Sequence, residues 1–375
     1  MISSLRHPPR ARLLTLLASG LLLGFVSCTA CNIGMRGGGA RLTLMSYNAD
    51  NLFDDVGDGT EYREFDPQNG EWTTELFHLR LQNLAEVIRA VSPVGPDVVA
   101  LEEIENRNVL TTLNDTYLKG MGYAVISPES RRTSVTVGLL TRLPILGARM
   151  HHTESESSEL LRDILEVRVD CAGVPLVLFV NHWKSKLGGA QGTEPDRRLS
   201  AAIVARRIVE LRQGEPALDI VVAGDLNECW DEYERIGGAY PTALMPDSHA
   251  ADAPAGGGSL DGSTLIAATP PSATLFVTAD RERVRANDRA AVLFSPWQET
   301  AAPGSYAFGG GWETIDNMLL AGSLFDGAGL EYESFETFRP DFMLTKEGSP
   351  LAWSTSSARG FSDHLPILLR LTRLR

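Results

Sequence analysis

The sequence predicts an α/β fold, because short apolar strand-like runs alternate along the chain with two longer segments of helical periodicity. Several of the runs are continuously apolar, as in 98–101 and 220–223, and such runs are typical of strands that are covered on both faces. The runs repeatedly end in a compact polar group, and polar side chains rejected by the core collect at strand ends. We therefore expect a sheet core with helices outside and a functional site where the strands end.

The first 31 residues predict an export signal that is not part of the fold. Three arginines precede the apolar run 13–26, which has the length of a signal peptide and is short for a membrane span. Phe25-Val26-Ser27-Cys28 resembles the cleavage signal of bacterial lipoproteins, so we expect either a lipid anchor at Cys28 or an ordinary signal peptide. The mature protein is then periplasmic, an outer-membrane lipoprotein or secreted. A Gly-rich tether over 32–40 leads into one folded domain over 41–375.

The elements of this domain follow from local patterns. A first helix begins after Thr73 or Thr74, buries a face that includes Phe77 and Leu81, and ends before Pro93. A second helix is expected from about Pro195 to 211, ending near 214. Strands are expected at 41–48, 97–103, 135–140, 164–169, 175–182, 220–227, 292–294, 314–320 and 365–371. The region 246–290 is rich in Ala, Gly, Pro and Ser, which predicts a surface insertion with little regular structure.

Composition limits the functions that fit the chain. The 375 residues are 43% hydrophobic, which is enough for one large core, and carry a net charge of −14. A protein that coats nucleic acid non-specifically has a strongly basic balance, so this charge argues against that class. It does not argue against an enzyme that meets phosphate through a metal ion. Cys28 and Cys31 lack the second pair that a zinc site needs, and Cys171 and Cys229 are available to pair in an oxidising compartment.

Six polar groups lie at or before the expected core strands: Asn48, Glu103, Asn181-His182, Asp225 with Asn227, Asp316, and Asp363-His364. Amide and carboxylate oxygens suit hard cations such as Mg²⁺, Mn²⁺ or Ca²⁺ better than zinc. Of seven histidines, two fall in these groups, and we expect the other five to be surface or structural residues. The polar groups therefore predict an oxygen-rich metal site with two histidines.

The motifs around these groups stand in a characteristic order. They are Ser46-Tyr47-Asn48-Ala49-Asp50-Asn51-Leu52-Phe53, Ala100-Leu101-Glu102-Glu103-Ile104-Glu105-Asn106, Asn181-His182-Trp183-Lys184-Ser185-Lys186, Gly224-Asp225-Leu226-Asn227, Ile315-Asp316 and Ser362-Asp363-His364-Leu365-Pro366. Together they resemble the endonuclease/exonuclease/phosphatase superfamily of metal-dependent phosphoesterases, which includes pancreatic-type deoxyribonuclease, abasic-site endonucleases, inositol-phosphate 5-phosphatases and bacterial sphingomyelinases. The resemblance implies a four-layer α/β sandwich of two packed mixed β-sheets flanked by helices, with the site at one end.

Two segments refine this resemblance. Residues 181–186 and 305–312 are most similar to the secreted nuclease-like branch. Asn317 departs from the pattern, because many relatives carry His or Tyr there, and we expect it to alter the packing beside the site. Glu102 stands where Gln is commoner, and we expect that change to be harmless.

The resemblance also implies a divalent cation as cofactor, Mg²⁺ first, with Mn²⁺ or Ca²⁺ as alternatives. Glu103 takes the role of metal ligand, Asp363 is a further oxygen ligand, and Asn48 binds the metal or orients groups near it. Glu102 and Glu105 stay open as alternatives to Glu103.

The catalytic roles implied by the resemblance fall on His182, Asp225, Asn227, Asp316 and His364. Asp225 and Asn227 orient the attacking water and bind the phosphate. Asp316 holds one ring nitrogen of His364 and so fixes its tautomer. His182 contacts phosphate oxygens or the leaving group. The role of base stays open between Asp225 and His364.

Several basic residues are candidates for binding the substrate. Arg162 and Lys184 take this role, while Lys186, Arg131 and Arg132 are equally compatible with steering a polyanion and with solvated surface.

The reaction implied is hydrolysis of a phosphodiester by water. We expect an exported, monomeric nuclease that acts on DNA and meets the membrane through an anchor at Cys28. Two alternatives stay open: a sphingomyelinase-like or inositol-phosphate-type phosphoesterase, and a non-catalytic surface binding protein on the same fold. The acidic charge counts against tight DNA binding. The sequence shows no long exposed aromatic hairpin, which counts against a lipid substrate. The complete set of polar residues counts against a protein without activity.

Overall fold

The computed structural model describes residues 40–128, 132–154, 160–252, 274–287 and 291–374. The expected export signal with Cys28, nearly all of the expected tether and the middle of the Ala/Gly/Pro-rich region lie outside these ranges. Within these ranges no helix is both long enough and apolar enough to span a bilayer.

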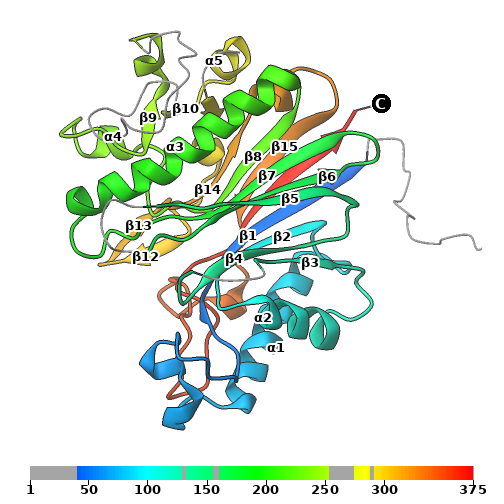
Figure 1. The fold of residues 1–375 in the computed structure, drawn as a ribbon, viewed down its shortest axis with the longest axis vertical. Helices are drawn as coiled ribbons and strands as arrows, with labels where there is room; N and C mark the ends of the chain where they lie inside the picture. The colour runs from blue at the N-terminus through cyan, green and yellow to red at the C-terminus, as the bar shows by residue number, and fades with distance from the viewer. Residues whose placement is uncertain (1–39, 129–131, 155–159, 253–273, 288–290, 375) are drawn as a thin grey trace, which may run out of the picture. The chain divides into compact units, whose positions relative to one another are not determined.

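Two large mixed β-sheets form the centre of the described chain (Figure 1). One has the strand order β15 (Leu330–Thr337), β16 (Ile367–Arg373), β1 (Arg41–Leu52), β2 (Val98–Ile104), β4 (Thr136–Thr141) and β3 (Ala124–Ile126). The other has the order β5 (Ile145–His151), β6 (Ile164–Asp170), β7 (Pro175–His182), β8 (Asp219–Asp225), β14 (Asp316–Leu320), β11 (Ala291–Phe294), β10 (Leu275–Thr278) and β9 (Leu244–Pro246). A separate hairpin joins β12 (Tyr306–Phe308) to β13 (Gly311–Glu313).

Three buried clusters of apolar side chains separate the layers. One lies between the two sheets and takes residues from β1, β2 and β4 on one side and from β6, β7 and β8 on the other. A second packs α1 (Thr74–Val91) and α2 (Arg107–Thr112) against the six-stranded sheet, and a third packs α3 (Ala190–Gly214) against the eight-stranded sheet. Two short helices, α4 (Glu232–Arg235) and α5 (Arg281–Ala286), complete the set in the described residues. The expected four-layer α/β sandwich is confirmed.

The first predicted helix agrees with the structure, and the second begins earlier than expected. The hydroxyl of Thr73 accepts a hydrogen bond from the Leu76 backbone and caps α1, which ends at Val91. Helix α3 begins at Ala190 rather than at Pro195. No N-cap side chain marks this start, because the capping position is Gly189, and Pro195 lies inside the helix rather than at its first position.

The expectation of little regular structure over 246–290 was wrong for its described part. Strand β10 pairs in parallel with β11, with Leu275 opposite Ala291, and α5 follows it. All four residues of β10 are buried. A four-residue strand inside a region of low-complexity composition leaves too short an apolar run to stand out in the sequence.

Strand pairing brings the polar groups of the eight-stranded sheet to one edge. The parallel pair β7 and β8 places His182 opposite Asp225, and the antiparallel pair β8 and β14 places Asp225 opposite Asp316. The backbone of Gly224 (φ +130°) approaches β7 so closely that a Cβ atom there would lie 2.0 Å from the Asn181 carbonyl oxygen. Glycine is therefore required beside the central residue of this row.

Candidate active site

Asn48 joins the two sheets at the site. Its side-chain amide donates to Glu103 Oε1 at 3.1 Å and to Asp225 Oδ2 at 3.0 Å, so a residue of β1 connects a carboxylate of β2 to one of β8. The ring nitrogen Nε2 of His182 lies 3.5 Å from Glu103 Oε1 and 3.8 Å from Asp225 Oδ2. These four residues were separate strand-end groups in the sequence, and the structure places their polar atoms together.

A bulge in β2 turns Glu103 toward this cluster. The pairing of β2 shifts register on both sides, between Asn48 and Leu52 of β1 and between Leu101 and Ile104 against β4, and Glu103 has a φ of +57°. A left-handed backbone is strained for a residue other than glycine and is found at functional sites. The bulge frees Glu103 from the alternation of the strand.

The two alternatives to Glu103 point elsewhere. Glu102 is fully buried and accepts a hydrogen bond from the Ser46 hydroxyl, and burial raises the pKa of its carboxyl well above the usual range. Glu105 accepts from the backbone of Asp54 and is one of three acids, with Asp58 and Glu61, that lie close together away from the site. Neither carboxylate belongs to the group formed around Glu103.

Asp316 and His364 form a hydrogen-bonded pair. Nδ1 of His364 lies 2.8 Å from Asp316 Oδ2, and the same oxygen accepts from the Ser305 hydroxyl. The ring of Tyr306 stacks on the imidazole with centroids 4.5 Å apart. Nδ1 therefore carries the proton that bonds Asp316, and Nε2 faces Asp225 at 3.8 Å. The sequence predicted the pair but assigned no role to Ser305 or Tyr306.

Asp363 lies at the rim of this arrangement. Its Oδ1 is 3.9 Å from Nε2 of His364, and in the described chain it belongs to neither of the two site groups of potential ligands, Glu103-His182-Asp225 and Asp225-Asp316-His364. Asp225, rather than Asp363, lies beside Glu103. A ligand role for Asp363 stays a prediction.

The two histidines have opposite pKa shifts. Burial, with Arg162 and His364 nearby, lowers the pKa of His182 well below its usual value, so this ring is neutral. Burial also opposes charge on His364, but Asp316 and the neighbouring carboxylates outweigh it and raise its pKa well above the usual value. Burial raises the pKa of Asp225 to about 7. The site thus holds a neutral imidazole, a charged imidazolium and a carboxyl group that titrates near neutral pH.

A small cavity of about 190 Å³ opens beside His182. Arg162 and Lys184, both predicted to bind substrate, line it together with hydroxyl groups. Nη1 of Arg162 bonds the Trp183 carbonyl at 3.4 Å, while its buried Nε has no hydrogen-bond partner among the residues described. The structure therefore brings both cations next to the site. Arg131 lies outside the described ranges.

The two asparagines that follow the central acids serve mainly the backbone. Asn227, in the left-handed region with φ +50°, donates its backbone N–H to Asp225 Oδ1 and its amide to the Trp183 carbonyl. Asn317 is fully buried and bonds the carbonyls of Glu228, 314 and 315. The effect of Asn317 on packing, relative to His or Tyr at this position, stays a prediction.

The donor set fits a divalent cation. Oxygens of Glu103 and Asp225 lie within hydrogen-bond distance of one amide nitrogen, and Asp316 and Asp363 are close by. Over the described ranges, no lysine or arginine forms an ion pair with any of these four carboxylates. The imidazolium of His364 faces three of these acids, so the carboxylates outnumber the positive charge beside them, and a hard cation with oxygen ligands relieves the remaining repulsion. Glu103 and Asn48 are the residues that would hold it, next to Asp225.

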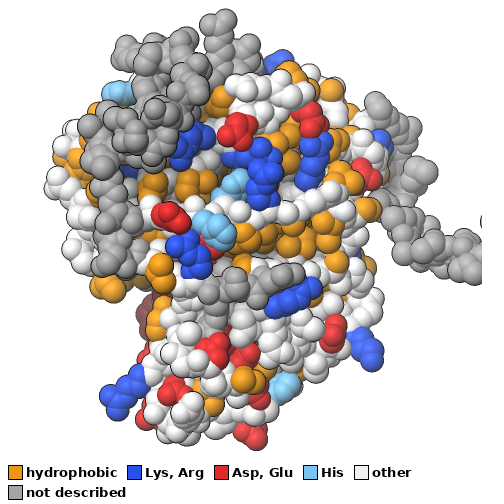
Figure 2. Space-filling view, in the orientation of Figure 1, with side chains coloured by type: hydrophobic (Ala, Val, Ile, Leu, Met, Phe, Trp, Pro, Cys, Tyr) orange, Lys and Arg blue, Asp and Glu red, His pale blue; other side chains and the backbone are white. Residues whose placement is uncertain are grey.

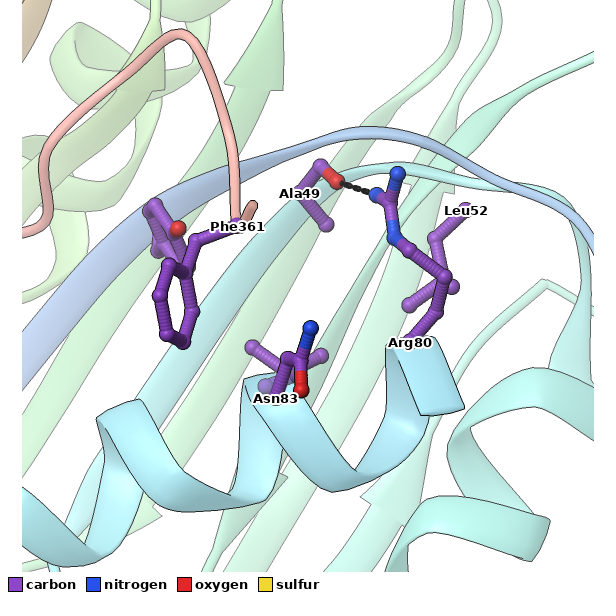
Figure 3. A pocket seen from close by; sticks show the side chains of 7 residues that line it. Ala49, Leu52, Arg80, Asn83 and Phe361 are labelled. Carbon is purple, nitrogen blue, oxygen red and sulfur yellow. Dashed lines mark hydrogen bonds between the residues drawn. The ribbon is translucent and has the colours of Figure 1, made fainter. Parts of the chain in front are cut away.

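A buried arginine of α1 holds the backbone that follows Asn48 (Figure 3). Arg80 is 3% exposed, donates to the carbonyls of Ala49 and Asp50, and stacks over the ring of Trp353. One turn further along α1, Asn83 bonds the carbonyl of residue 360 at the start of the loop that carries His364. The helix thus fixes both the strand end after Asn48 and the loop before His364.

Histidines and cysteines outside the site have structural surroundings. The rings of His78, His151 and His152 bond Tyr117, Glu166 and Asp163, which agrees with the expected structural roles. Cys171 and Cys229 are both buried and free, and they do not form the disulfide that an oxidising compartment would allow. Figure 2 shows a face on which basic and acidic side chains are interspersed rather than a continuous basic surface.

One family model and several solved structures match this chain. The model of the endonuclease/exonuclease/phosphatase family matches residues 43–234. The fold is similar to that of a family protein from Bacteroides thetaiotaomicron (14% identity, 89% of this chain and 95% of that chain, TM-score 0.50) and to TDP2 from Caenorhabditis elegans (13% identity, 90% and 77%, TM-score 0.50). The human Nocturnin catalytic domain is a more distant match (14% identity, 89% and 95%, TM-score 0.48). No curated protein sequence matches the chain.

Proposed function

Because this chain belongs to the endonuclease/exonuclease/phosphatase family, we propose that it is an exported, metal-dependent phosphodiesterase whose favoured substrate is DNA. The observation that carries the proposal is the convergence of Glu103, Asp225, His182 and the Asp316–His364 pair at one end of the two sheets. Carboxylates with two histidines in different charge states supply what phosphodiester hydrolysis requires.

A divalent cation would supply positive charge to the non-bridging oxygens of the phosphate, and Mg²⁺ is the ion we favour. The remaining work falls on side chains. His364 is held by Asp316 at Nδ1 and presents Nε2–H as a hydrogen-bond donor to a phosphate oxygen. Asp225 lies 3.8 Å from Nε2 of both histidines and beside Glu103, so it orients the attacking water and accepts its proton. The sequence left the base open between Asp225 and His364, and we assign this role to Asp225.

His182 and the adjoining cations orient the substrate. The ring of His182 is neutral and buried, so it can donate one hydrogen bond without competing with the metal for the carboxylates. Arg162 and Lys184 line the same cavity as His182 and attract a phosphate next to the scissile one. Asn227 holds the backbone between Asp225 and the residues around Trp183.

A cleavage assay on residues 32–375 tests the proposal. Plasmid DNA, RNA, sphingomyelin and a generic phosphodiester are incubated with Mg²⁺, Mn²⁺, Ca²⁺ or a chelator. We expect metal-dependent cleavage of DNA, and a loss of turnover by about 10²–10³-fold in H364A, the usual range for a lost hydrogen-bond donor to a transition-state oxygen. H78A is the matched control, because His78 bonds Tyr117 outside the site.

The outcomes separate the alternatives. Preferential cleavage of sphingomyelin or of an inositol phosphate in a parallel reaction favours the lipid or sugar-phosphate alternative. A folded protein that cleaves no phosphoester with any metal, but binds a cell-surface ligand, is the non-catalytic alternative. Near-native turnover of folded H364A contradicts the assignment of His364.

Export is a separate part of the proposal and rests on residues 1–31. Cell fractionation of the full chain and of C28S measures it. We expect the native protein in the membrane or periplasmic fraction, and loss of membrane association in C28S if Cys28 carries lipid. Retention of the unprocessed native chain in the cytoplasm contradicts export.

A further inference from the structure

A row of aromatic rings leads from the site into solvent. The imidazole of His364 stacks on Tyr306 with centroids 4.5 Å apart, and Tyr306 is nearly parallel to Phe308, with an interplanar angle of 9° and centroids 6.1 Å apart. Phe308 is 68% exposed. An aromatic side chain with this exposure, aligned with rings that begin at a catalytic imidazole, has ring surface available to a ligand.

The hairpin β12–β13 holds this row in place. Residues two apart on a strand point to the same face, which puts Tyr306 and Phe308 on one side of β12. The strand is fixed to the catalytic loop, because the backbone of Leu365 bonds the Ser305 carbonyl and Tyr306 pairs with His364. The position of Phe308 relative to the imidazole is therefore set by backbone pairing.

We propose that Phe308, backed by Tyr306, is a stacking surface for an unpaired nucleobase next to the scissile phosphate. The inference rests on the proposed function and deepens it, because it names single-stranded nucleic acid as the preferred substrate class. Each base of a single strand offers a ring face that stacks on aromatic side chains whatever its sequence, whereas a base inside a duplex has both faces covered by neighbouring base pairs.

The surroundings of Phe308 disfavour a lipid surface. Lys186 Nζ is bound by Glu232 at 2.9 Å and lies 3.5 Å from Glu313 of β13, so acids accompany the nearest cation. Arg339 stacks over Trp312, which pairs with Ala307 and so faces away from Tyr306 and Phe308. A single exposed phenylalanine next to acids, on a chain of net charge −14, is a weak anchor for a lipid bilayer.

The test compares F308A and F308W with the native protein on three substrates: a single-stranded oligonucleotide, its duplex and a base-free oligonucleotide built of abasic residues. L187A is the control, because Leu187 is also highly exposed but is not aromatic. Stacking on one aromatic side chain is worth about 1–3 kcal/mol per base, so F308A should raise KM for the single strand by about 5- to 150-fold. Its kinetics on the base-free strand should stay within about twofold, F308W should restore the native KM, and L187A should have no effect.

Binding measured without turnover keeps this inference separate from the proposed function. Fluorescence anisotropy in chelator gives the affinities for the single strand and for the base-free strand. Tighter binding of the strand with bases, lost in F308A, supports the inference even if no nucleic acid is cleaved. Equal effects of F308A on both strands, or no effect on either, overturn it. Loss of binding to phosphatidylcholine vesicles in F308A, with unchanged oligonucleotide affinity, also overturns it and assigns the ring to a lipid surface.

Discussion

Substituting Asp316 by asparagine removes the charge that holds His364 while keeping the shape of the side chain. The amide oxygen of the introduced asparagine can still accept the hydrogen bond from Nδ1, but the charge assistance is lost in a pair that is buried on both sides. A hydrogen bond to a charged group contributes about 1.5–3 kcal/mol and a neutral one about 0.5–1.5 kcal/mol, so the charge assistance is worth about 1–1.5 kcal/mol. If that energy acts in the transition state, turnover falls by about 5- to 13-fold.

The pH dependence of D316N gives a second and independent readout. Asp316 is the first of the groups that raise the pKa of His364, so its removal lowers that pKa. If the protonated imidazole is the active form, the alkaline limb of the pH–rate profile moves to lower pH in D316N. A shift to higher pH contradicts this reasoning.

The assay is steady-state cleavage of a generic phosphodiester at saturating metal, with thermal unfolding measured on the same samples. D219N is the matched control, because Asp219 is another buried aspartate at the opposite end of β8, about 20 Å from Asp225 along the strand. D219N should keep native turnover. Turnover of folded D316N within threefold of native, or an equal loss in D219N, refutes the role of Asp316.

Three further predictions concern the metal, the backbone and stability. Calorimetric titration of Mn²⁺ should show affinity reduced by at least about 10- to 100-fold in E103Q, the range for loss of a residue that only supports a metal ligand; E102Q should have the smaller effect, because the Glu102 carboxyl accepts from Ser46 and belongs to neither group of potential ligands at the site. G224A should fold poorly or lose more than about 3 kcal/mol of stability in urea unfolding, because its Cβ would meet the Asn181 carbonyl at 2.0 Å; a native-like midpoint would contradict this. Burial raises the pKa of Asp219 to about 7, so the stability of the native protein should fall as the pH rises from about 4 to 7. The D219N protein should lack that slope and be more stable than the native protein at pH 8 by about 1–4 kcal/mol. An unchanged slope in D219N would contradict this prediction.

The sequence predicts the layers of the fold better than the boundaries of its elements. Two patterns indicate burial directly: the continuous apolar run before Asp225 and the helical face that includes Phe77. Both segments lie in the expected layers. The start of α3 and the strand β10 were missed for different reasons. The first has a glycine at the capping position and so no capping side chain to mark it, and the second pairs with neighbouring strands that its own sequence does not identify.

At the site, the types of the functional residues were predictable, but the residues that hold them in position were not. Arg80 lies three residues after Phe77 and four before Leu84, on the buried stripe of α1, and a charge at such a position indicates a buried partner. The partners are backbone carbonyls of Ala49 and Asp50, which no sequence pattern identifies. The ring of Tyr306 was likewise visible in the sequence, but its place on the imidazole depends on a pairing between distant segments.

The two histidines show where this limit lies. His182 and His364 are the same residue type, both are buried, and each lies within 4 Å of Asp225, yet their pKa values shift in opposite directions. The difference comes from Asp316, which bonds Nδ1 of His364, whereas Nδ1 of His182 has no hydrogen-bond partner in the described chain. Asp316 reaches the site because β14 pairs with β8 in one register, and a shift by one residue would turn its side chain to the other face of the sheet. The chemical difference between two identical side chains is thus decided by the register of one strand pair.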